Sequence, residues 1–164
     1  MSSNVIFTIV KKYDFVLNNK SLYDLYFPII GNDATNLYIN LYNFSEKALS
    51  SGIRVQDLSS LINASHMTIE SFHETRSMLE AFRLISTYLD AEENKYYFEL
   101  HEPLTFNKFV DNQKYRHLLI KNIGQVSYEG LEYVYNNNHF PRNAINISSV
   151  FDQVIKDEQI KSIS

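Results

Sequence analysis

The chain has 164 residues, a formal net charge of −4 and no cysteine. This length suits one domain, and the missing cysteine excludes disulfides and thiolate metal sites. The acidic balance argues against a surface that coats nucleic acid. We expect a cytoplasmic location, because no apolar run reaches the roughly 18 residues of a membrane span and no signal-peptide pattern opens the chain.

β-Branched and aromatic residues near the N-terminus predict a strand over residues 4–10, which could continue over 11–17 after a bend. A first helix over residues 21–27 follows, with leucine and tyrosine side chains on one face. Pro28 and Gly31 should end this helix, because both residue types interrupt helices.

A longer amphipathic helix should begin at Asn32 or Asp33, since both are good N-caps. Its apolar residues recur at steps of three and four, namely Ala34, Leu37, Tyr38, Leu41, Phe44 and Ala48. A short segment over residues 53–62 follows, with Val55, Leu58, Leu61 and Ile62 on one side. After a turn, residues 68–82 predict another amphipathic helix, whose apolar stripe contains Ile69, Phe72, Leu79 and Phe82.

Residues 84–89 and 96–100 predict two strands around a polar turn at 90–95. Three helices followed by a hairpin is the order of a winged helix, in which the second and third helices form the helix-turn-helix and the hairpin is the wing. After Pro103 the chain is helical again, with candidate core residues Phe106, Phe109, Leu118, Leu119 and Ile123. Beyond the break at Gly124, residues 126–135 and 147–160 predict further helices.

The predicted fold class is mostly α with a small β component (α+β). It is a winged helix with an N-terminal strand and helix extension and C-terminal helices. We place the N-terminal extension at residues 1–31, the winged-helix core at 32–104 and the C-terminal helical extension at 105–164. We expect all three regions to form one compact domain.

Residue constellations typical of enzymes are scarce. Glu70 and His73 have the Glu-x-x-His spacing, which places two ligands on one helix face, but a di-iron bundle needs that motif twice and two further glutamates. We favour a solvated helix face there over a metal-dependent enzyme. The four glycines stand apart, so no phosphate-binding loop is predicted. We expect no catalytic, cofactor-binding or metal-ligating residue.

A winged helix often reads DNA through its third helix, which should offer cations to phosphates and polar side chains to base edges. The helix over residues 68–82 instead carries Glu70, Glu74 and Glu80 against Arg76, and glutamates outnumber the lysine of the wing. Phosphates repel such a surface. A winged-helix DNA-binding transcriptional regulator is therefore the alternative function. A better cationic stretch contains the weak DNA-contact candidates Lys108, Lys114, Arg116 and Lys121, although an ordinary solvated helix face also explains them.

Tyrosines and the first strand point to self-association. Aromatic residues are enriched at protein interfaces, although core packing also explains them. If the first strand lies at a sheet edge, its unpaired backbone groups can bind a second copy. The candidate self-association residues are Ile6, Phe7, Ile9, Tyr23 and Tyr26.

The stretch "LYFPIIGNDATNLYINL" resembles a hallmark of the DnaD/DnaB helicase-loading family. The similarity is to the N-terminal region of the replication initiation and membrane attachment proteins of low-G+C bacteria. Their pattern is matched by Leu25, Tyr26, Pro28, Ile29, Ile30, Gly31, Ala34, Leu37, Tyr38 and Leu41. "LEAFRLISTY", "YYFELHEPLTFNKF" and "NISSVFDQV" resemble later segments of the same region.

The resemblance implies a primosome component that helps to load the replicative helicase, with this region serving as a winged-helix oligomerisation module. It implies a homodimer or homotetramer, other primosome proteins as partners (a DnaD-like protein, the helicase and its loader), and membrane association through partners. Single-stranded DNA binding belongs in the family to a C-terminal domain that this sequence lacks, so we expect a fragment of a longer protein. Arg83 departs from the pattern, because the family usually has glycine there.

Overall fold

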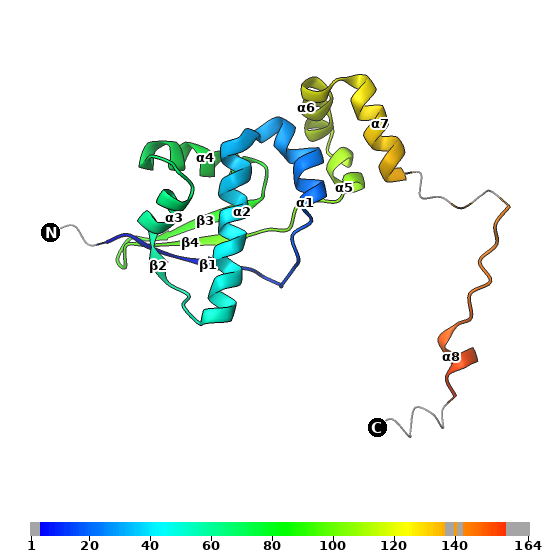
Figure 1. Ribbon diagram of the computed structural model, residues 1–164, viewed down its shortest axis with the longest axis horizontal. Coiled ribbons are helices and arrows are strands. Elements are labelled where there is room, and N and C mark those ends of the chain that lie inside the picture. The colour runs from blue at the N-terminus through cyan, green and yellow to red at the C-terminus, as the bar shows by residue number, and fades with distance from the viewer. Residues whose placement is uncertain (1–3, 137–139, 141–142, 157–164) are drawn as a thin grey trace.

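The computed structural model describes residues 4–136, 140 and 143–156 and contains a four-stranded sheet in the order β2-β1-β4-β3 (Figure 1). The strands are β1 (Ile6–Val10), β2 (Gln56–Asp57), β3 (Ile85–Asp90) and β4 (Lys95–Leu100). β3 and β4 form the antiparallel hairpin that the sequence predicts, and β1 pairs in parallel with β4. The predicted α+β class is confirmed.

Helices make up most of the described chain. They are α1 (Asn19–Ser21), the π-helical turn η1 (Leu22–Tyr26), α2 (Phe27–Ser51), α3 (Leu58–Ala64), α4 (Ile69–Ala81), α5 (Phe106–Asp111), α6 (Gln113–Ile123), α7 (Gln125–Asn136) and α8 (Phe151–Val154). In Figure 1, α2 crosses the sheet beside α3 and α4, while α5, α6 and α7 gather next to α1. The order α2, α3, α4 and hairpin is that of a winged helix, as predicted.

The chain bends where the sequence predicts, at Pro28 and Gly31. Pro28 has no N–H and its ring would crowd a regular turn before it. The preceding turn is widened to a π-helix, in which the Phe27 N–H donates to the Leu22 carbonyl. Gly31 has φ 84° and ψ −177°, a conformation that is almost restricted to glycine, and divides α2 into two helical parts. The Thr35 hydroxyl donates to the Gly31 carbonyl oxygen at 2.8 Å.

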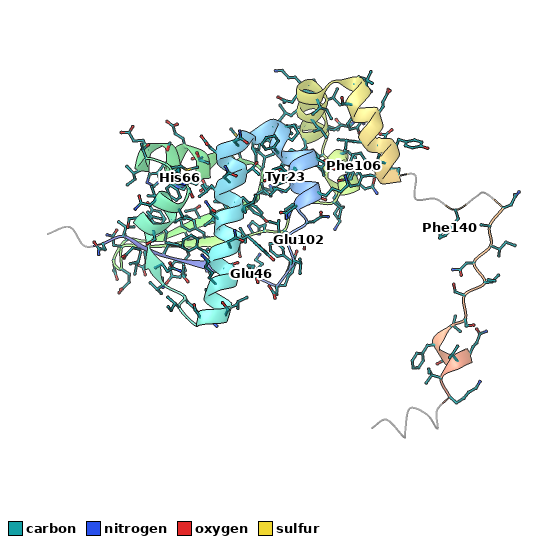
Figure 2. All side chains as sticks on the ribbon, in the orientation of Figure 1. Tyr23, Glu46, His66, Glu102, Phe106 and Phe140 are labelled. Carbon is teal, nitrogen blue, oxygen red and sulfur yellow. The ribbon has the colours of Figure 1, made fainter. Side chains whose placement is uncertain are left out.

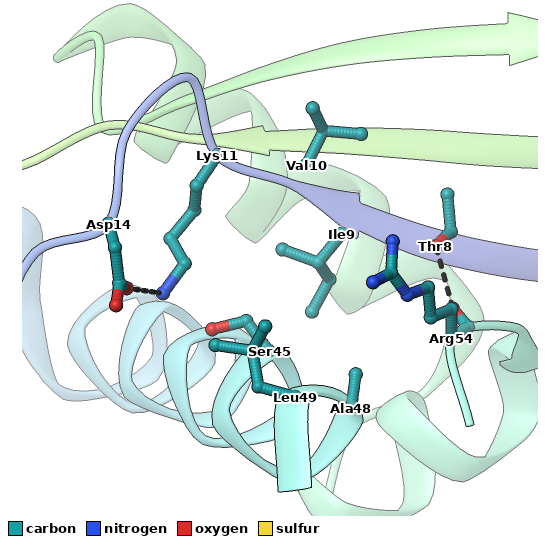
Figure 3. Close-up of a pocket in the computed structure, with 9 residues that line it drawn as sticks. All are labelled: Thr8, Ile9, Val10, Lys11, Asp14, Ser45, Ala48, Leu49 and Arg54. Atoms are coloured by element: carbon teal, nitrogen blue, oxygen red, sulfur yellow. Dashed lines mark hydrogen bonds and ion pairs between the residues drawn. The ribbon is translucent and has the colours of Figure 1, made fainter. Parts of the chain in front are cut away.

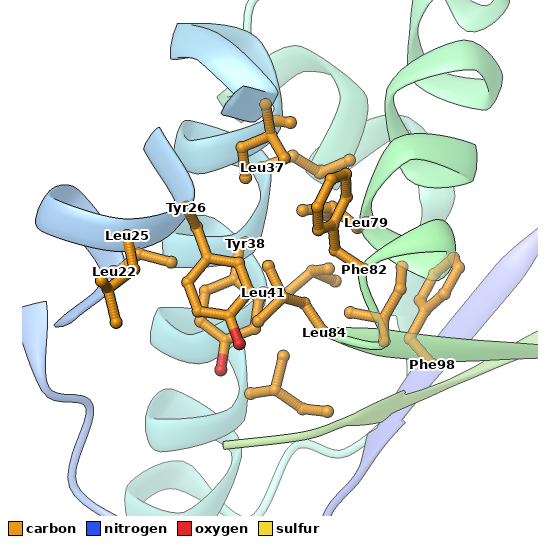
Figure 4. Packing of buried hydrophobic residues seen from close by; sticks show 14 of the residues in the cluster. Leu22, Leu25, Tyr26, Leu37, Tyr38, Leu41, Leu79, Phe82, Leu84 and Phe98 are labelled. Atoms are coloured by element: carbon orange, nitrogen blue, oxygen red, sulfur yellow. The ribbon is translucent and has the colours of Figure 1, made fainter. Parts of the chain in front are cut away.

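The core lies between α2, α4 and the sheet, and Figure 4 shows its leucine and aromatic side chains converging there. In the predicted stripe of α2, Ala34, Leu37, Tyr38 and Leu41 are buried, while Phe44 and Ala48 are half-buried. Two buried tyrosines also fix the segment between the wing and α5. The Tyr38 hydroxyl donates to the His101 carbonyl oxygen, and the Tyr26 hydroxyl accepts from the Leu104 N–H at 3.0 Å.

The end of α4 shows how the chain accommodates Arg83. Arg83 has φ 57°, in the left-handed region. Its N–H donates to the Glu80 carbonyl at 3.0 Å and the Leu84 N–H donates to the Leu79 carbonyl at 2.9 Å. This pair of bonds is the Schellman motif, which usually has glycine at the left-handed position. The chain therefore keeps the helix cap with an arginine in the strained position.

Several local predictions were wrong. Residues 11–17 do not continue β1; the chain bends at residues 12–13, and Lys11 pairs with Asp14 at 3.0 Å and with Glu46 at 3.1 Å. Ile69 and Val55 are exposed rather than part of the apolar stripes. The helix predicted over 147–160 is present only as α8, and residues 157–160 lie outside the described residues. The division at residues 31 and 104 stays a prediction.

Candidate functional site

The exposed surface of α4, the recognition helix of a winged helix, is acidic. Glu70 and Glu74 are exposed, while the arginine of this helix is engaged. Arg76 Nη1 lies 2.7 Å from Glu80 Oε2, and its Nε donates to His73 Nδ1 at 2.9 Å. Glu80 also accepts from the Thr87 hydroxyl of β3. The one cation that α4 could offer to a phosphate is therefore held by an internal network against the wing.

His73 belongs to this network rather than to a metal site. Its Nδ1 accepts a hydrogen bond, which requires an unprotonated nitrogen. Burial lowers the pKa of His73, and the neighbouring Arg76 lowers it further. Among the described residues, no group of three potential ligands is placed to hold a metal ion, and Glu70 is on the exposed side of the helix.

The wing does not supply the missing positive charge. Asp90 Oδ1 accepts the backbone N–H groups of Glu92 and Glu93 at 3.1 and 3.2 Å, which closes the turn. Asn94 completes it with φ 53°, a conformation that asparagine tolerates. The Lys95 ammonium lies over the Tyr97 ring, 4.7 Å from its centroid. The turn thus presents two glutamates, as the sequence indicates.

The four cationic candidates for DNA contact are all exposed, but they do not share one face. Lys114 and Lys121 lie seven residues apart on α6 and so point the same way. Arg116 faces α7, where its guanidinium carbon lies 5.9 Å from the centroid of the Tyr128 ring. Lys108 is on α5. The surface around Lys114 and Lys121 is a small cationic pair rather than a continuous ridge.

The candidate self-association residues divide into two groups. Phe7 is 2% exposed and Tyr26 is 1% exposed, so the prediction that they contact a second copy was wrong. Phe7 packs against Phe44 and Phe98, and Tyr26 packs against Phe109 with ring centroids 5.0 Å apart. Ile6 and Ile9 are half-buried, and Tyr23 is 45% exposed. These three remain available on the surface.

β1 is not an edge strand, but half of its outer side is open. β2 pairs with Ile6 and Phe7 alone, so the described residues place no strand beside Thr8 to Val10 on that side. A groove of about 450 Å³ runs there between β1 and the end of α2, with Ile9, Ala48, Leu49 and Arg54 among its lining residues (Figure 3). The Thr8 hydroxyl donates to the Arg54 carbonyl at 2.6 Å at the point where β2 ends. This groove was not predicted, because it depends on a strand of two residues.

Comparison with protein families matches the chain to the DnaB N-terminal winged helix domain over residues 1–163. The chain belongs to this family. Comparison with solved structures gives the primosome protein DnaB (residues 1–300) from Geobacillus stearothermophilus, with a TM-score of 0.78 and 20% sequence identity. The match covers 93% of this chain and 59% of that chain, so this chain spans less than two thirds of that structure's length. Comparison with curated proteins gave no match.

Membership of the DnaB N-terminal family confirms the resemblance drawn from the Pro-Ile-Ile-Gly motif, and the solved structure supports the winged-helix fold. The geometry explains why that motif is informative. Pro28 and Gly31 produce the widened turn and the kink, and Tyr26 and Tyr38 carry the hydroxyls that bind the segment after the wing. No helix in the described part of the chain is long and apolar enough to span a membrane.

Proposed function

We propose that this winged helix is the protein-assembly module of a primosome protein that acts in replication initiation and helicase loading. Membership of the DnaB N-terminal family supports a part in replication initiation. The acidic surface of α4 supports a role in protein assembly rather than in DNA binding. The single observation that carries the proposal is the engagement of Arg76 by Glu80 and His73, which leaves Glu70 and Glu74 as the exposed charges of the presumed recognition helix. Such a helix repels the phosphates of DNA and remains free to contact proteins.

The proposed partners are other copies of this chain, in a dimer or tetramer, and other primosome proteins. The latter are a DnaD-like protein, the replicative helicase and its loader. The proposed location is the cytoplasm, with any membrane association arising through partners. DNA binding at high affinity is assigned to other parts of a longer protein, with a weak contribution from the exposed lysines of α5 and α6.

The surface proposed for self-association is the outer face of the sheet at β1, together with the unpaired edge beside Thr8 to Val10. Ile6, Thr8 and Val10 point away from the face that packs on α2, because strand residues alternate and Phe7 is on the core side. The same outer face carries Tyr88 and Tyr97 from the hairpin, since Thr8 pairs with Tyr97 and Tyr97 pairs with Tyr88. A second copy that packs there would cover β-branched and aromatic side chains and the unpaired half of the strand.

Light scattering coupled to size-exclusion chromatography tests this proposal. The unchanged chain should be a dimer or tetramer at tens of micromolar. Ile6→Lys should weaken the assembly, because it places a charge on the proposed contact surface. Val16→Lys is the matched control, since Val16 is 86% exposed and lies in the loop after β1. A strict monomer at that concentration would contradict the proposed self-association.

The exposed pair of Lys114 and Lys121 favours a second candidate function, weak DNA binding. Phosphate contacts produce a steep loss of affinity as salt rises, by about 0.9 in the logarithmic slope for each phosphate neutralised. Measuring affinity for single- and double-stranded DNA over a range of salt concentrations distinguishes the two functions. Reversing both lysines to glutamate should abolish any such binding, while Lys95→Glu in the wing should leave it unchanged.

A further inference from the structure

One face of α7 is apolar and exposed. Val126 is 84% exposed, Tyr133 is 68% exposed and Val134 is 56% exposed, whereas Tyr128 on the opposite face is buried. At 100° per residue, Gly130 lies between these three exposed side chains on the helix surface. Large apolar side chains that share one exposed helix face indicate a contact surface rather than scattered surface residues.

A groove of about 600 Å³ lies beside this face, where α7 meets the bend of the first helix. Its lining is mostly apolar, with Tyr23, Pro28, Ile123, Leu131 and Val134, and also includes Gly130, Ser127 and the Asp24 carboxylate that Tyr135 binds. Gly130 is inside a helix and has no positive φ, so the backbone does not require glycine there. A Cβ at this position would meet nothing within 4 Å. The glycine instead leaves open space, which we call the notch, in the lining of the groove.

The C-terminal segment carries side chains that match such a groove. We call residues 143–156 the arm. Its exposed apolar residues are Ile145, Ile147, Val150, Phe151 and Val154. Ile147, Val150, Phe151 and Val154 have the i, i+3, i+4, i+7 spacing of a helix that docks one face into a groove. The arm has formed one helical turn, α8, and the apolar spacing extends one turn further towards the N-terminus.

The arm lies apart from the helices and the sheet of its own chain. In Figure 1 the ribbon from residue 143 onward lies apart from α7 and the sheet. Figure 2 places Phe140 on the connection to the arm, far from Tyr23 at the groove. An apolar arm that projects from its own domain and an exposed, mostly apolar groove on the same chain are the two features that an exchange contact between identical copies requires.

We propose that the arm of one copy occupies the α7 groove of a second copy, with residues 147–154 helical when bound. Phe151 and Val154 then lie over the notch at Gly130, and α8 gains its missing turn because the groove buries the apolar face that water leaves unstable. Two copies that exchange arms form a closed pair with two equivalent contacts. This contact rests on the proposed function, because it requires that copies of the chain associate. It uses a surface separate from β1.

Cysteine cross-linking tests the contact directly, because the chain has no cysteine of its own. Ser127→Cys places a thiol at the rim of the groove, and Ser148→Cys places one on the flank of the arm; both side chains are exposed. The two single variants of the intact chain are mixed in equal amounts and oxidised. Mass spectrometry of the digest should find the 127–148 disulfide in excess of the 127–127 and 148–148 disulfides. Equal amounts of all three would contradict the proposal.

Gly130 supplies a matched pair of variants. Gly130→Glu fills the notch with a carboxylate and should lower the 127–148 yield about tenfold, because the arm would bury an unpaired charge. Gly130→Ala adds no charge at the notch and should preserve the yield, while thermal unfolding checks that both variants fold. An unchanged yield in Gly130→Glu would overturn the proposal.

Two further outcomes separate the arm contact from other arrangements. A chain that carries both cysteines should give dimers joined by 127–148 disulfides; a monomer with an internal disulfide would show that the arm binds its own groove and would overturn the exchange. Ile6→Lys should reduce the assembly mediated by β1 and leave the 127–148 disulfide in place. If Ile6→Lys has no effect on assembly while the 127–148 disulfide persists, the result contradicts the proposed β1 contact and supports the arm contact.

Discussion

Replacing Arg83 with glycine should stabilise the chain. Arg83 has φ 57° at the end of α4, and its N–H and that of Leu84 complete the helix cap. Its neighbours Phe82 and Leu84 are buried in the core, so the backbone cannot relax to a negative φ without withdrawing one of them. The arginine side chain itself is exposed, which means that its removal takes little packing away.

The size of the effect follows from two opposing contributions. A side chain with a Cβ costs roughly 1–2 kcal/mol in the left-handed conformation, and glycine removes that cost. Glycine also gives the unfolded chain more freedom, which offsets about 0.4–1 kcal/mol of the gain. The net increase in the free energy of unfolding should be on the order of 1 kcal/mol, equivalent to a rise of about 2–4 °C in Tm for a chain of this size.

Urea unfolding followed by circular dichroism measures this change. Arg83→Ala is the control, because it removes the same side chain but keeps the Cβ, and its free energy of unfolding should stay within about 0.5 kcal/mol of the unchanged chain. If Arg83→Gly and Arg83→Ala have equal stability, the strain at this position is absent and the reasoning is wrong. If both gain stability, the guanidinium rather than the backbone is the source.

Three further predictions concern the bend and the acidic helix. Gly31→Ala should lower the free energy of unfolding by about 1–3 kcal/mol in a urea titration, because φ 84° with ψ −177° is nearly forbidden to alanine although space for the Cβ is open. Burial raises the pKa of Tyr26 to about 12, so its folded neutral form stabilises the chain fully below pH 10 and that contribution is lost as pH rises towards 12. The difference in unfolding free energy between the unchanged chain and Tyr26→Phe should therefore shrink by on the order of 2 kcal/mol between pH 9 and pH 12, and a constant difference would contradict the burial argument. Changing Glu70 and Glu74 to lysine should create salt-dependent DNA binding, measured by fluorescence anisotropy, while no gain in affinity would show that α4 is blocked by shape rather than by charge.

Local patterns were sufficient for the winged helix. The apolar steps of α2 follow the helical repeat, and the buried residues Leu37, Tyr38 and Leu41 are the ones that the repeat selects. The hairpin was predictable because alternating strands enclose a polar turn. Parallel pairing of β1 with β4 was not, since about 90 residues separate the two strands and no local pattern records which strands meet. β2 is too short to leave any alternation in the sequence.

The contact residues were harder to predict than the fold. Helical spacing identifies which residues share a face, but it does not tell whether that face packs on the same chain or on another. Tyr23 and Tyr26 illustrate the difficulty, because they lie on one short helix and yet Tyr26 is buried against Phe109 while Tyr23 is exposed. The apolar pattern of residues 147–154 predicts a helix that the isolated chain forms only in part. If this apolar face packs on a second copy, as proposed, nothing within the same chain covers it.

The bend connects the core with the proposed α7 groove. Tyr26 and Tyr38 hold the segment from His101 to Leu104, which ties the connection between the wing and α5 to η1 and α2. The Tyr135 hydroxyl donates to Asp24 Oδ2 at 2.8 Å, which ties α7 to the same helix. The walls of the α7 groove thus include η1 and α7, which this bond joins, and Pro28, which lies three residues before the kink at Gly31. A change at that kink should therefore disturb arm docking as well as stability, even though Gly31 does not line the groove.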